Sequence, residues 1–258
     1  MTDYEMAALL REQGWGTIPP EQYTSDIEEA FLGIWSLVKP FTMTYLERGY
    51  ALYKAAEYVC HNRLPGDFVE CGVWKGGSSM LMALSLLNFN DTARNLCLYD
   101  TFTGMTEPTR EDVIAWNGRS VVEKWEKNAF DTWAVGKKEV EANMASTGYP
   151  AGKIRYIAGD VCETLDRTAP ESIALLRLDT DWYRSTAKEL EILYPKLCPG
   201  GVLIIDDYGH FKGARKAVDE YFSKIGYFPY LHRSDYTGRV MINRLSFLTP
   251  ANCSSICL

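Results

Sequence analysis

The stretch FVECGVWKGGS, residues 68–78, decides the fold class of this chain. Residues 68–71 form a short, mostly apolar run that ends at Gly72, as buried strands commonly do. Two more glycines follow at positions 76 and 77, and the apolar spacing of residues 78–87 predicts a helix directly after them. A strand, a glycine-rich turn and a helix, in this order, form the first unit of a parallel α/β sheet.

The alternation of strand and helix continues toward the C-terminus. Four more strands are predicted at residues 96–99, 153–159, 173–178 and 202–205, and two more helices at residues 186–197 and 213–225. Residues 107–149 are too many for a simple crossover and predict an insertion of two or three helices. Residues 227–244 predict a terminal antiparallel hairpin around the turn sequence SDYTG. We therefore expect a doubly wound, mostly parallel seven-stranded sheet, with ligands at the carboxyl ends of its strands.

Upstream of the sheet, apolar spacing predicts helices at residues 3–13, 26–38 and 44–63, with the breaker-rich stretch GWGTIPPEQ between the first two. We therefore divide the chain into an N-terminal helical extension, residues 1–63, and one compact domain, residues 64–258, which carries the insertion. The extension and the insertion are expected to form a lid that selects the substrate, and to contribute to a homodimer contact.

Composition excludes several classes of protein. The 258 residues are 47% hydrophobic and 24% charged, which is typical of a globular domain and not of a disordered chain, a coiled coil or a collagen-like fibre. A net charge of −7 disfavours a nucleic-acid partner. No apolar run is long enough to span a membrane, and the N-terminus does not resemble a signal peptide. Seven scattered cysteines predict reduced thiols in a cytoplasmic protein.

The glycine-rich turn is the first candidate ligand site. Glycines allow a ligand to approach the backbone closely, and the N-terminus of the following helix offers free N–H groups to an anion. In a dinucleotide fingerprint the central glycine leaves room for a pyrophosphate, but the chain has Trp74 at that position. The turn therefore suits an amino-acid carboxylate better than NAD. A tight turn without a ligand is the alternative.

Two aspartates follow the next predicted strands. Asp100, at the end of the second strand, is placed to accept hydrogen bonds from the hydroxyls of a ribose. Asp160, after the third strand, is placed to reach an adenine amino group. Each aspartate could instead be a helix N-cap. Together with the first strand end, they predict a nucleoside pocket.

A third candidate site combines the ends of two neighbouring strands. Asp179 ends one predicted strand, and Asp206 and Asp207 end the next, one strand–helix unit later. A right-handed crossover brings these strand ends side by side, and the converging carboxylates would repel one another without a cation. A ligand set of oxygen atoms alone favours Mg²⁺, Mn²⁺ or Ca²⁺ over zinc. The alternative is that Asp181, Asp206 or Asp207 merely caps a loop.

Two other side chains flank this predicted cation site. His210 follows Asp207 by three residues and is either a base near the metal or a solvent-facing loop histidine. Arg184 is placed to contact an anionic substrate.

Four segments together resemble the macrocin O-methyltransferase family: GDFVECGVWKGGSSMLMA, LYDTFTGM, RLDTDWYRST and PGGVLIIDDYG. The resemblance covers about residues 42–243. It implies a class I methyltransferase fold of Rossmann-like type that uses S-adenosylmethionine and Mg²⁺ or Mn²⁺. Members of the family methylate sugars of antibiotics, including macrolides and aminocoumarins.

The resemblance also implies roles for individual residues. Asp179, Asp206 and Asp207 would bind the metal, and Asp179 would also be the general base. The methionine end of the cofactor would lie against the turn, at Glu70, Gly72, Gly76, Gly77 and Ser78. Asp100 would bind the ribose, and Asp160 would lie near the adenine. One relative has a catalytic histidine where this chain has Trp182, which gives Asp179 more weight as the base.

We therefore predict a metal-dependent O-methyltransferase that acts on a free hydroxyl of a small molecule, in particular a deoxysugar of a glycosylated natural product. Two alternatives stay open. An NAD-dependent reductase fits the same sheet but is disfavoured by Trp74 and by the lack of a Tyr-x-x-x-Lys pair after a suitable strand. A non-catalytic nucleotide- or metal-binding module is disfavoured by the cluster of three aspartates beside open space.

Overall fold

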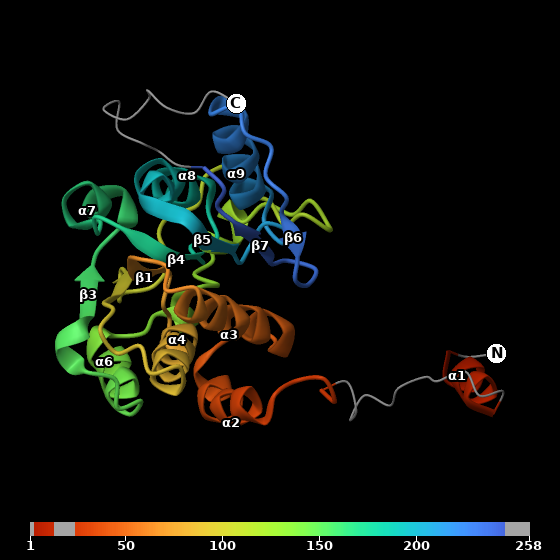
Figure 1. Cartoon of the computed structure of the whole chain (residues 1–258). Helices are drawn as coiled ribbons and strands as arrows, with labels where there is room; N and C mark the ends of the chain where they lie inside the picture. Colours follow the sequence, from red (N-terminus) through yellow and green to blue (C-terminus); the bar gives the residue numbers. More distant parts are fainter. Residues whose placement is uncertain (1–2, 13–23, 246–258) are drawn as a thin grey trace, which may run out of the picture. The chain divides into compact units, whose positions relative to one another are not determined.

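The structure, a computed structural model, describes residues 3–12 and 24–245 (Figure 1). These residues form two units, which divide between residues 33 and 34. The smaller unit contains helix α1 (Asp3–Glu12), and helix α2 (Glu29–Val38) crosses the division. The breaker-rich stretch at residues 14–22 lies outside the described residues.

The larger unit is built on a seven-stranded sheet in the order β3-β2-β1-β4-β5-β7-β6. Its strands are β1 (Asp67–Cys71), β2 (Leu96–Asp100), β3 (Ile154–Ala158), β4 (Ile173–Leu178), β5 (Leu197–Ile205), β6 (His232–Arg233) and β7 (Arg239–Ile242). The first five strands are parallel, and β7 pairs antiparallel with both β5 and β6. This confirms the predicted fold, with its terminal hairpin. The strand order reverses between β1 and β4, and ligands bind at such a switch point.

Two layers of helices pack against the sheet (Figure 1). Helices α3 (Leu46–His61), α4 (Gly77–Asn88) and α6 (Lys137–Ala145) form one layer, and α7 (Val161–Thr168), α8 (Tyr183–Leu193) and α9 (Lys212–Lys224) form the other. The shorter pieces are α5 (Val122–Trp125), η2 (Lys39–Phe41), η3 (Asp131–Trp133), η4 (Ala151–Lys153) and η5 (Tyr194–Lys196).

The main core lies between the sheet and the α7–α9 layer. Leu176 and Leu178 of β4, Leu203 of β5 and Val218 of α9 are almost completely buried there. On the other face, Leu52, Ala56 and Val59 of α3 are buried as their spacing predicts, whereas Tyr45 is exposed at the N-cap of that helix. Helix α3, which the sequence analysis assigns to the N-terminal extension, is thus part of the larger unit.

The largest differences from the predicted boundaries lie at α8 and at the start of β5. The helix predicted at residues 186–197 begins earlier, at Tyr183, and ends at Leu193. Pro195 follows within a 3-10 turn, because proline cannot continue the helix, and strand β5 begins at Leu197 and not at residue 202. The residues between Leu197 and Val202 bulge out of register with β4, and Gly200 has a φ of 84° there. The bulge conceals the early start of this strand from a sequence pattern.

The insertion, the cysteines and the lengths of the helices can also be compared with the predictions. The insertion contains α5, η3 and α6, which agrees with two or three helices. All five cysteines in the described part of the chain are free, as predicted, and Cys253 and Cys257 lie outside it. Among the described residues, no helix is both long and apolar enough to cross a membrane.

Candidate active site

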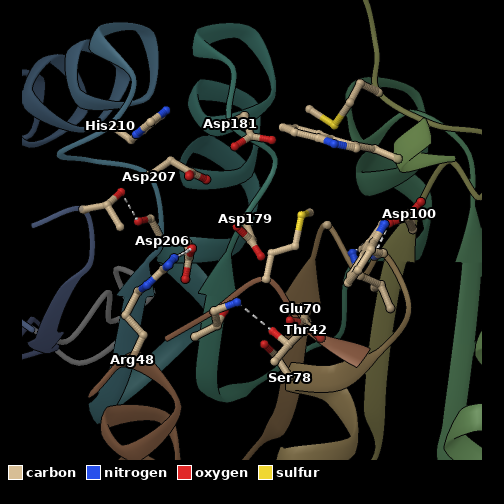
Figure 2. A pocket seen from close by; sticks show the side chains of 18 of the residues that line it. Thr42, Arg48, Glu70, Ser78, Asp100, Asp179, Asp181, Asp206, Asp207 and His210 are labelled. Carbon is tan, nitrogen blue, oxygen red and sulfur yellow. Dashed lines mark hydrogen bonds and ion pairs between the residues drawn. The ribbon is translucent and has the colours of Figure 1, made fainter. Parts of the chain in front are cut away.

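A cavity of about 1050 Å³, including its mouth, opens at the carboxyl ends of β1, β2, β4 and β5 (Figure 2). Its lining includes six acidic residues: Glu70, Asp100, Asp179, Asp181, Asp206 and Asp207. The strand order explains this gathering, because the carboxyl ends of neighbouring parallel strands meet at one edge of the sheet. Of the predicted cofactor residues, Glu70, Gly72, Ser78 and Asp100 line the cavity.

The two acids on the cofactor side are held firmly. Glu70 is 1% exposed, accepts a hydrogen bond from Ser79 of α4, and pairs with Arg177 at 2.7 Å. Asp100 accepts hydrogen bonds from the backbone N–H groups of Val73 at 2.7 Å and Trp74 at 3.1 Å. Asp100 therefore ties the end of β2 to the glycine-rich turn that follows β1.

Gly72 lies where the end of β1 approaches the end of β4 so closely that a side chain would not fit. Its φ is 83°, and a Cβ atom there would lie 1.9 Å from the carbonyl oxygen of Asp179. Gly76 is the left-handed N-cap of α4, and Gly77 packs against the backbone of Phe41. These two glycines shape the turn, and neither is among the residues that line the cavity.

A second cavity of about 410 Å³ adjoins the first and shares Gly72 and Asp100 with it. Asp160 lines this second cavity. The same side chain is the N-cap of α7 and accepts a hydrogen bond from the N–H of Cys162 at 2.8 Å. Both interpretations of Asp160 from the sequence therefore agree with its position.

Three carboxylates form a cluster on the other side of the first cavity. Asp179, Asp181 and Asp207 each present an oxygen atom, and these atoms lie within 4.8 Å of one another (Figure 2). Burial, together with repulsion between neighbouring carboxylates, raises the pKa of all three well above the usual value for aspartate. One oxygen of Asp207 is buried without a hydrogen-bond partner. A set of oxygen ligands with an orphaned, buried carboxylate oxygen fits a hard divalent cation.

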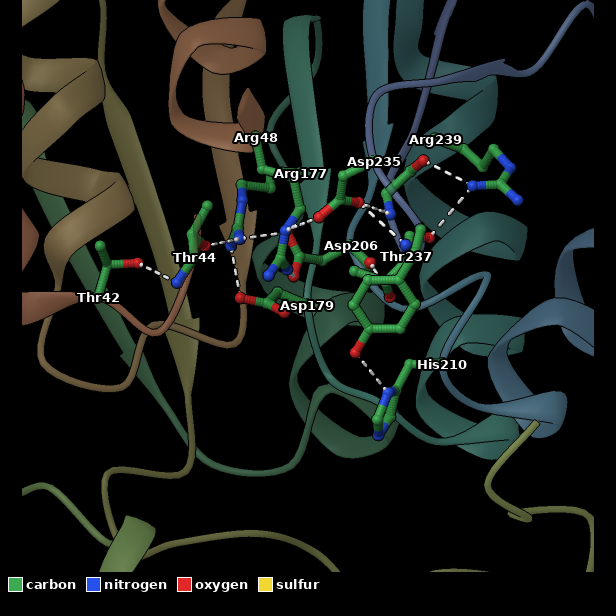
Figure 3. Close-up of polar contacts among 12 residues, drawn as sticks. Thr42, Thr44, Arg48, Arg177, Asp179, Asp206, His210, Asp235, Thr237 and Arg239 are labelled. Carbon is green, nitrogen blue, oxygen red and sulfur yellow. Dashed lines mark hydrogen bonds and ion pairs between the residues drawn. The ribbon is translucent and has the colours of Figure 1, made fainter. Parts of the chain in front are cut away.

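Asp206, a predicted metal ligand, takes part in a different interaction. Its carboxylate pairs with Arg177 at 2.6 Å and with Arg48 of α3, and Figure 3 shows this network. Arg48 in turn pairs with Asp235 at 3.0 Å. The structure therefore brings Asp179 and Asp207 together with Asp181, while Asp206 is held by two arginines.

Two arginines of the site, Arg177 and Arg48, were not predicted from the sequence. Arg177 is 2% exposed, and its guanidinium pairs with Glu70, Asp179 and Asp206 at 2.6–2.7 Å. Its pKa is raised well above the usual arginine value by the charges of these carboxylates, although burial alone would lower it. A signal for Arg177 existed, since it is the one charged residue in the apolar strand IALLRL. Arg48 has no comparable signal, because an arginine on a helix is usually solvated.

Several aromatic side chains also line the first cavity. They include Trp133 of the insertion, Phe211 and Tyr236. His210 also lines the cavity, and its Nδ1 lies 2.8 Å from the Tyr236 hydroxyl (Figure 3). Burial lowers the pKa of His210. Arg184 lines a surface groove beside α8 and α9 and is not among the residues of this cavity.

The fold and the cavity define a class of enzyme. The O-methyltransferase NovP has the same fold, with a TM-score of 0.70 and 30% identity over 80% of this chain and 83% of that one. The calicheamicin methyltransferase CalS11, at 19% identity, also shares the fold, with a TM-score of 0.57 over 89% of this chain and 95% of that one. This is the class I fold of S-adenosylmethionine-dependent O-methyltransferases.

Within this class, the chain belongs to the macrocin O-methyltransferase family, whose sequence model matches residues 33–241. A relative from Streptomyces olivaceus, 8-demethyl-8-(2,3-dimethoxy-alpha-L-rhamnosyl)-tetracenomycin-C 4'-O-methyltransferase, is 35% identical over 76% of this chain and 73% of its own length. Demethyldecarbamoylnovobiocin O-methyltransferase of Streptomyces niveus is 33% identical over 71% and 68%. The chain is therefore an O-methyltransferase that uses S-adenosylmethionine, and the alternatives of an NAD-dependent reductase and a non-catalytic module are not supported.

Proposed function

We propose that this enzyme transfers a methyl group from S-adenosylmethionine to a sugar hydroxyl of a glycosylated natural product, with the help of a divalent cation. The observation that carries the proposal is the cluster of Asp179, Asp181 and Asp207, in the same cavity as the acidic cofactor side. Relatives named for methylation of a rhamnosyl tetracenomycin and of a mycinamicin support a sugar as the acceptor.

The cofactor would extend over the ends of β1 and β2. The buried carboxylate of Glu70 can accept the ammonium group of its methionine part, and Gly72 and Ser78 leave room beside it. Asp100 accepts hydrogen bonds from three backbone N–H groups, those of Val73, Trp74 and Phe102, and would bind the ribose hydroxyls with its remaining lone pairs. The adjoining cavity, with Asp160, would take the adenine.

The cation would be held by Asp179, Asp181 and Asp207. A divalent ion there would act as a Lewis acid and lower the pKa of a bound hydroxyl, which supplies the nucleophile near neutral pH. Asp206, which the resemblance implies as a ligand, would instead hold Arg177 and Arg48 in position beside the cluster, because each of its two oxygens pairs with one of these arginines. The ligand set thus keeps two of the three residues that the family resemblance implied.

The chain itself must align the reactants and accept one proton. The hydroxyl oxygen forms a bond to the methyl carbon as the bond from that carbon to the sulfonium sulfur breaks, and the hydroxyl proton passes to a carboxylate. Asp179, the base implied by the resemblance, pairs with Arg177, whose charge opposes the rise in the pKa of Asp179 that burial causes. The products are a methyl ether and S-adenosylhomocysteine.

Two measurements test this function on the full chain. Thermal unfolding with S-adenosylhomocysteine, compared with NADH, reports on the cofactor, because a ligand of the folded state raises Tm. We expect a shift with S-adenosylhomocysteine alone. Methylation of rhamnosylated polyketides and aminocoumarins, followed by mass spectrometry with Mg²⁺ or with EDTA, reports on the acceptor and the cation. We expect EDTA to abolish turnover.

Variants separate the two halves of the cavity. Asp207→Asn and Asp179→Asn should each lower turnover by about 100-fold or more and leave the shift with S-adenosylhomocysteine intact. The control is Asp166→Asn, which changes an exposed aspartate on α7 and should alter neither. Full turnover in EDTA would contradict the role of the cation, and near-normal turnover of Asp179→Asn would remove that residue as the base.

A further inference from the structure

Asp181 is held in an unusual backbone conformation. Its φ is 65°, and the N–H of Trp182 donates a hydrogen bond to the carbonyl of Thr180 at 2.7 Å. A three-residue turn of this kind, with a positive φ at a residue other than glycine, is rare and strained. Such a conformation persists only where the surrounding structure imposes it. Neighbouring residues must therefore hold this turn, which directs Asp181 into the carboxylate cluster (Figure 2).

The first restraint is Trp182, the residue that follows. Its side chain is 1% exposed, and its indole N–H donates a hydrogen bond to the carbonyl of Thr106 at 2.9 Å. The indole ring contacts Phe130 and Phe211 edge to face, with centroids 5.7 and 5.1 Å away. Thr106 and Phe130 belong to one segment of the chain and precede Trp182 by at least 52 residues in the sequence. Their contacts with the indole ring fix the position of Trp182.

The second restraint is Asp112, in the same segment. Asp112 is completely buried, and its carboxylate accepts hydrogen bonds from the N–H of Tyr183 at 2.7 Å and the N–H of Thr109 at 2.6 Å. Tyr183 is the first residue of α8. Gly213 of α9 makes room for this carboxylate, because a Cβ atom there would lie 1.9 Å from its oxygen. Asp112 therefore anchors the segment directly behind the strained turn.

The segment that supplies these restraints is residues 105–135, which we call the clamp segment. It also supplies Met105, Trp133 and Val135 to the wall of the cavity, and Trp133 contacts Phe130 at a centroid distance of 4.9 Å. The wall beside the carboxylate cluster and the restraints on Asp181 are thus parts of one packed unit. The restraints on Asp181 do not involve Glu70 or Asp100, although Met105 and Thr106 of the clamp also line the second cavity.

We propose that Trp182 and Asp112 are positioning residues through which the clamp segment holds Asp181 in its place in the cation site. This inference rests on the proposed function, since it assigns the clamp to the cation site of that function. It follows that loosening the clamp weakens the binding of a divalent cation much more than the binding of the cofactor, which meets the clamp only at Met105 and Thr106 in the second cavity.

The test uses Trp182→Phe in the full chain. Phenylalanine keeps an aromatic ring in the cluster but lacks the N–H that binds the Thr106 carbonyl. The matched control is Trp116→Phe, which changes a tryptophan of the clamp segment that is 74% exposed. Mn²⁺ binding is measured by electron paramagnetic resonance, and binding of S-adenosylhomocysteine by calorimetry. We expect Trp182→Phe to weaken Mn²⁺ binding by about tenfold, as loss of a group that orients a metal ligand does, with a clearly smaller change in cofactor affinity. Trp116→Phe should change neither.

Several outcomes would overturn the inference. Unchanged Mn²⁺ affinity in Trp182→Phe would show that the clamp does not hold Asp181. Equal losses of Mn²⁺ and cofactor affinity would show a general structural role. Should Trp182→Phe not fold, Asp112→Asn, which keeps the shape and weakens the acceptor, provides the same comparison, with exposed Asp131→Asn as its control. A wild-type chain that binds the cofactor but no Mn²⁺ would refute the cation site itself, which is a failure of the proposed function and distinct from a failure of the variants.

Discussion

Arg177 carries a full charge into a strand that is otherwise apolar and buried. Such a charge is costly in the interior unless it is paired, and the Arg177 guanidinium is paired with three carboxylates. Register explains how they meet. Glu70 is the neighbour of Arg177 across β1 and β4, Asp179 lies two residues further along on the same face, and Asp206 extends the adjacent strand β5. The arginine thus joins the cofactor side of the cavity to the carboxylate cluster.

We predict that Arg177→Met lowers the free energy of unfolding by roughly 3–5 kcal/mol, because three carboxylates lose their buried partner. Denaturant titration measures the loss, and part of it should be regained at lower pH, where the carboxylates can take up protons. Arg94→Met is the control, since Arg94 also pairs with a carboxylate, Asp91 at 2.6 Å, but away from the cavity. A loss no greater than that of Arg94→Met would contradict this account of Arg177.

Glu189 is a second buried acid, and it supports the loop between Asp179 and Asp181. It is completely buried on α8, and the hydroxyl of Thr180 donates a hydrogen bond to its carboxyl at 2.8 Å. Its other oxygen has no partner. Burial raises the pKa of Glu189 from the ordinary 4.5 to about 8. The carboxyl is therefore neutral in the folded protein at pH values where it is ionised in the unfolded chain.

The raised pKa of Glu189 makes the stability of the protein depend on pH. The folded state binds a proton that the unfolded state releases, so Glu189 makes the protein less stable as pH rises from about 4.5 to about 8. Glutamine resembles the neutral acid, and Glu189→Gln should remove this loss. We expect the Tm advantage of the variant over the wild type to grow between about pH 5 and about pH 9. The exposed Glu171→Gln is the control, and a pH-independent difference would argue against a raised pKa.

At the scale of elements, the turn between β1 and α4 is determined by contact between strand ends. The N–H of Gly72 donates a hydrogen bond to the carbonyl of Tyr99, and the N–H of Asp179 donates one to the carbonyl of Cys71. These bonds draw the ends of β1, β2 and β4 together. From the sequence, the role predicted for Gly72 is to let a ligand approach the backbone. In the structure, its missing side chain makes room for the backbone of Asp179.

Gly72→Ala and Gly118→Ala form a matched pair. Both positions have a positive φ, 83° and 71°, but an added Cβ at Gly118 meets nothing within 4 Å. We expect Gly118→Ala to cost ~1 kcal/mol of stability, from the left-handed conformation alone. Gly72→Ala should cost several times more and weaken binding of S-adenosylhomocysteine, because β1 and β4 must move apart. Calorimetric unfolding and ligand titration measure both effects, and equal costs would exclude the overlap with Asp179.

At the scale of the whole molecule, the cavity concentrates negative charge. Among the described residues that line it, six are acidic and Arg48 is the one arginine or lysine. In the metal-free protein the carboxyls of Asp179, Asp181 and Asp207 have raised pKa values, so they favour the protonated form more than the unfolded chain does. Their ionisation therefore destabilises the metal-free fold as pH rises above the ordinary aspartate pKa of about 4.

A divalent cation should reverse this effect by stabilising the ionised cluster. We predict that the rise in Tm on adding Mg²⁺ increases from about pH 5 to about pH 8, and that Asp207→Asn reduces it. Differential scanning calorimetry at several pH values measures the change. A Mg²⁺ effect that is largest at the acidic end would contradict the assignment of the cation to these carboxylates.

The predicted homodimer, and the predicted role of residues 1–63 as a lid, stay predictions. One part of that extension does reach the site, since Arg48 of α3 pairs with Asp206. The insertion contributes Trp133 and Val135 to the wall of the cavity, and its role in selecting the acceptor also stays a prediction.

The sequence by itself determined the sheet, the glycine-rich turn and the placing of acids at strand ends. It could do so because these features depend on local patterns and on the rule that neighbouring parallel strands end at one edge. It did not determine which acids meet. Asp206 and Asp207 are adjacent, and consecutive residues at a strand end point to opposite sides. Only the tertiary structure brings Arg177 and Arg48 to Asp206, and the clamp segment to the turn at Asp181, because these partners come from distant elements.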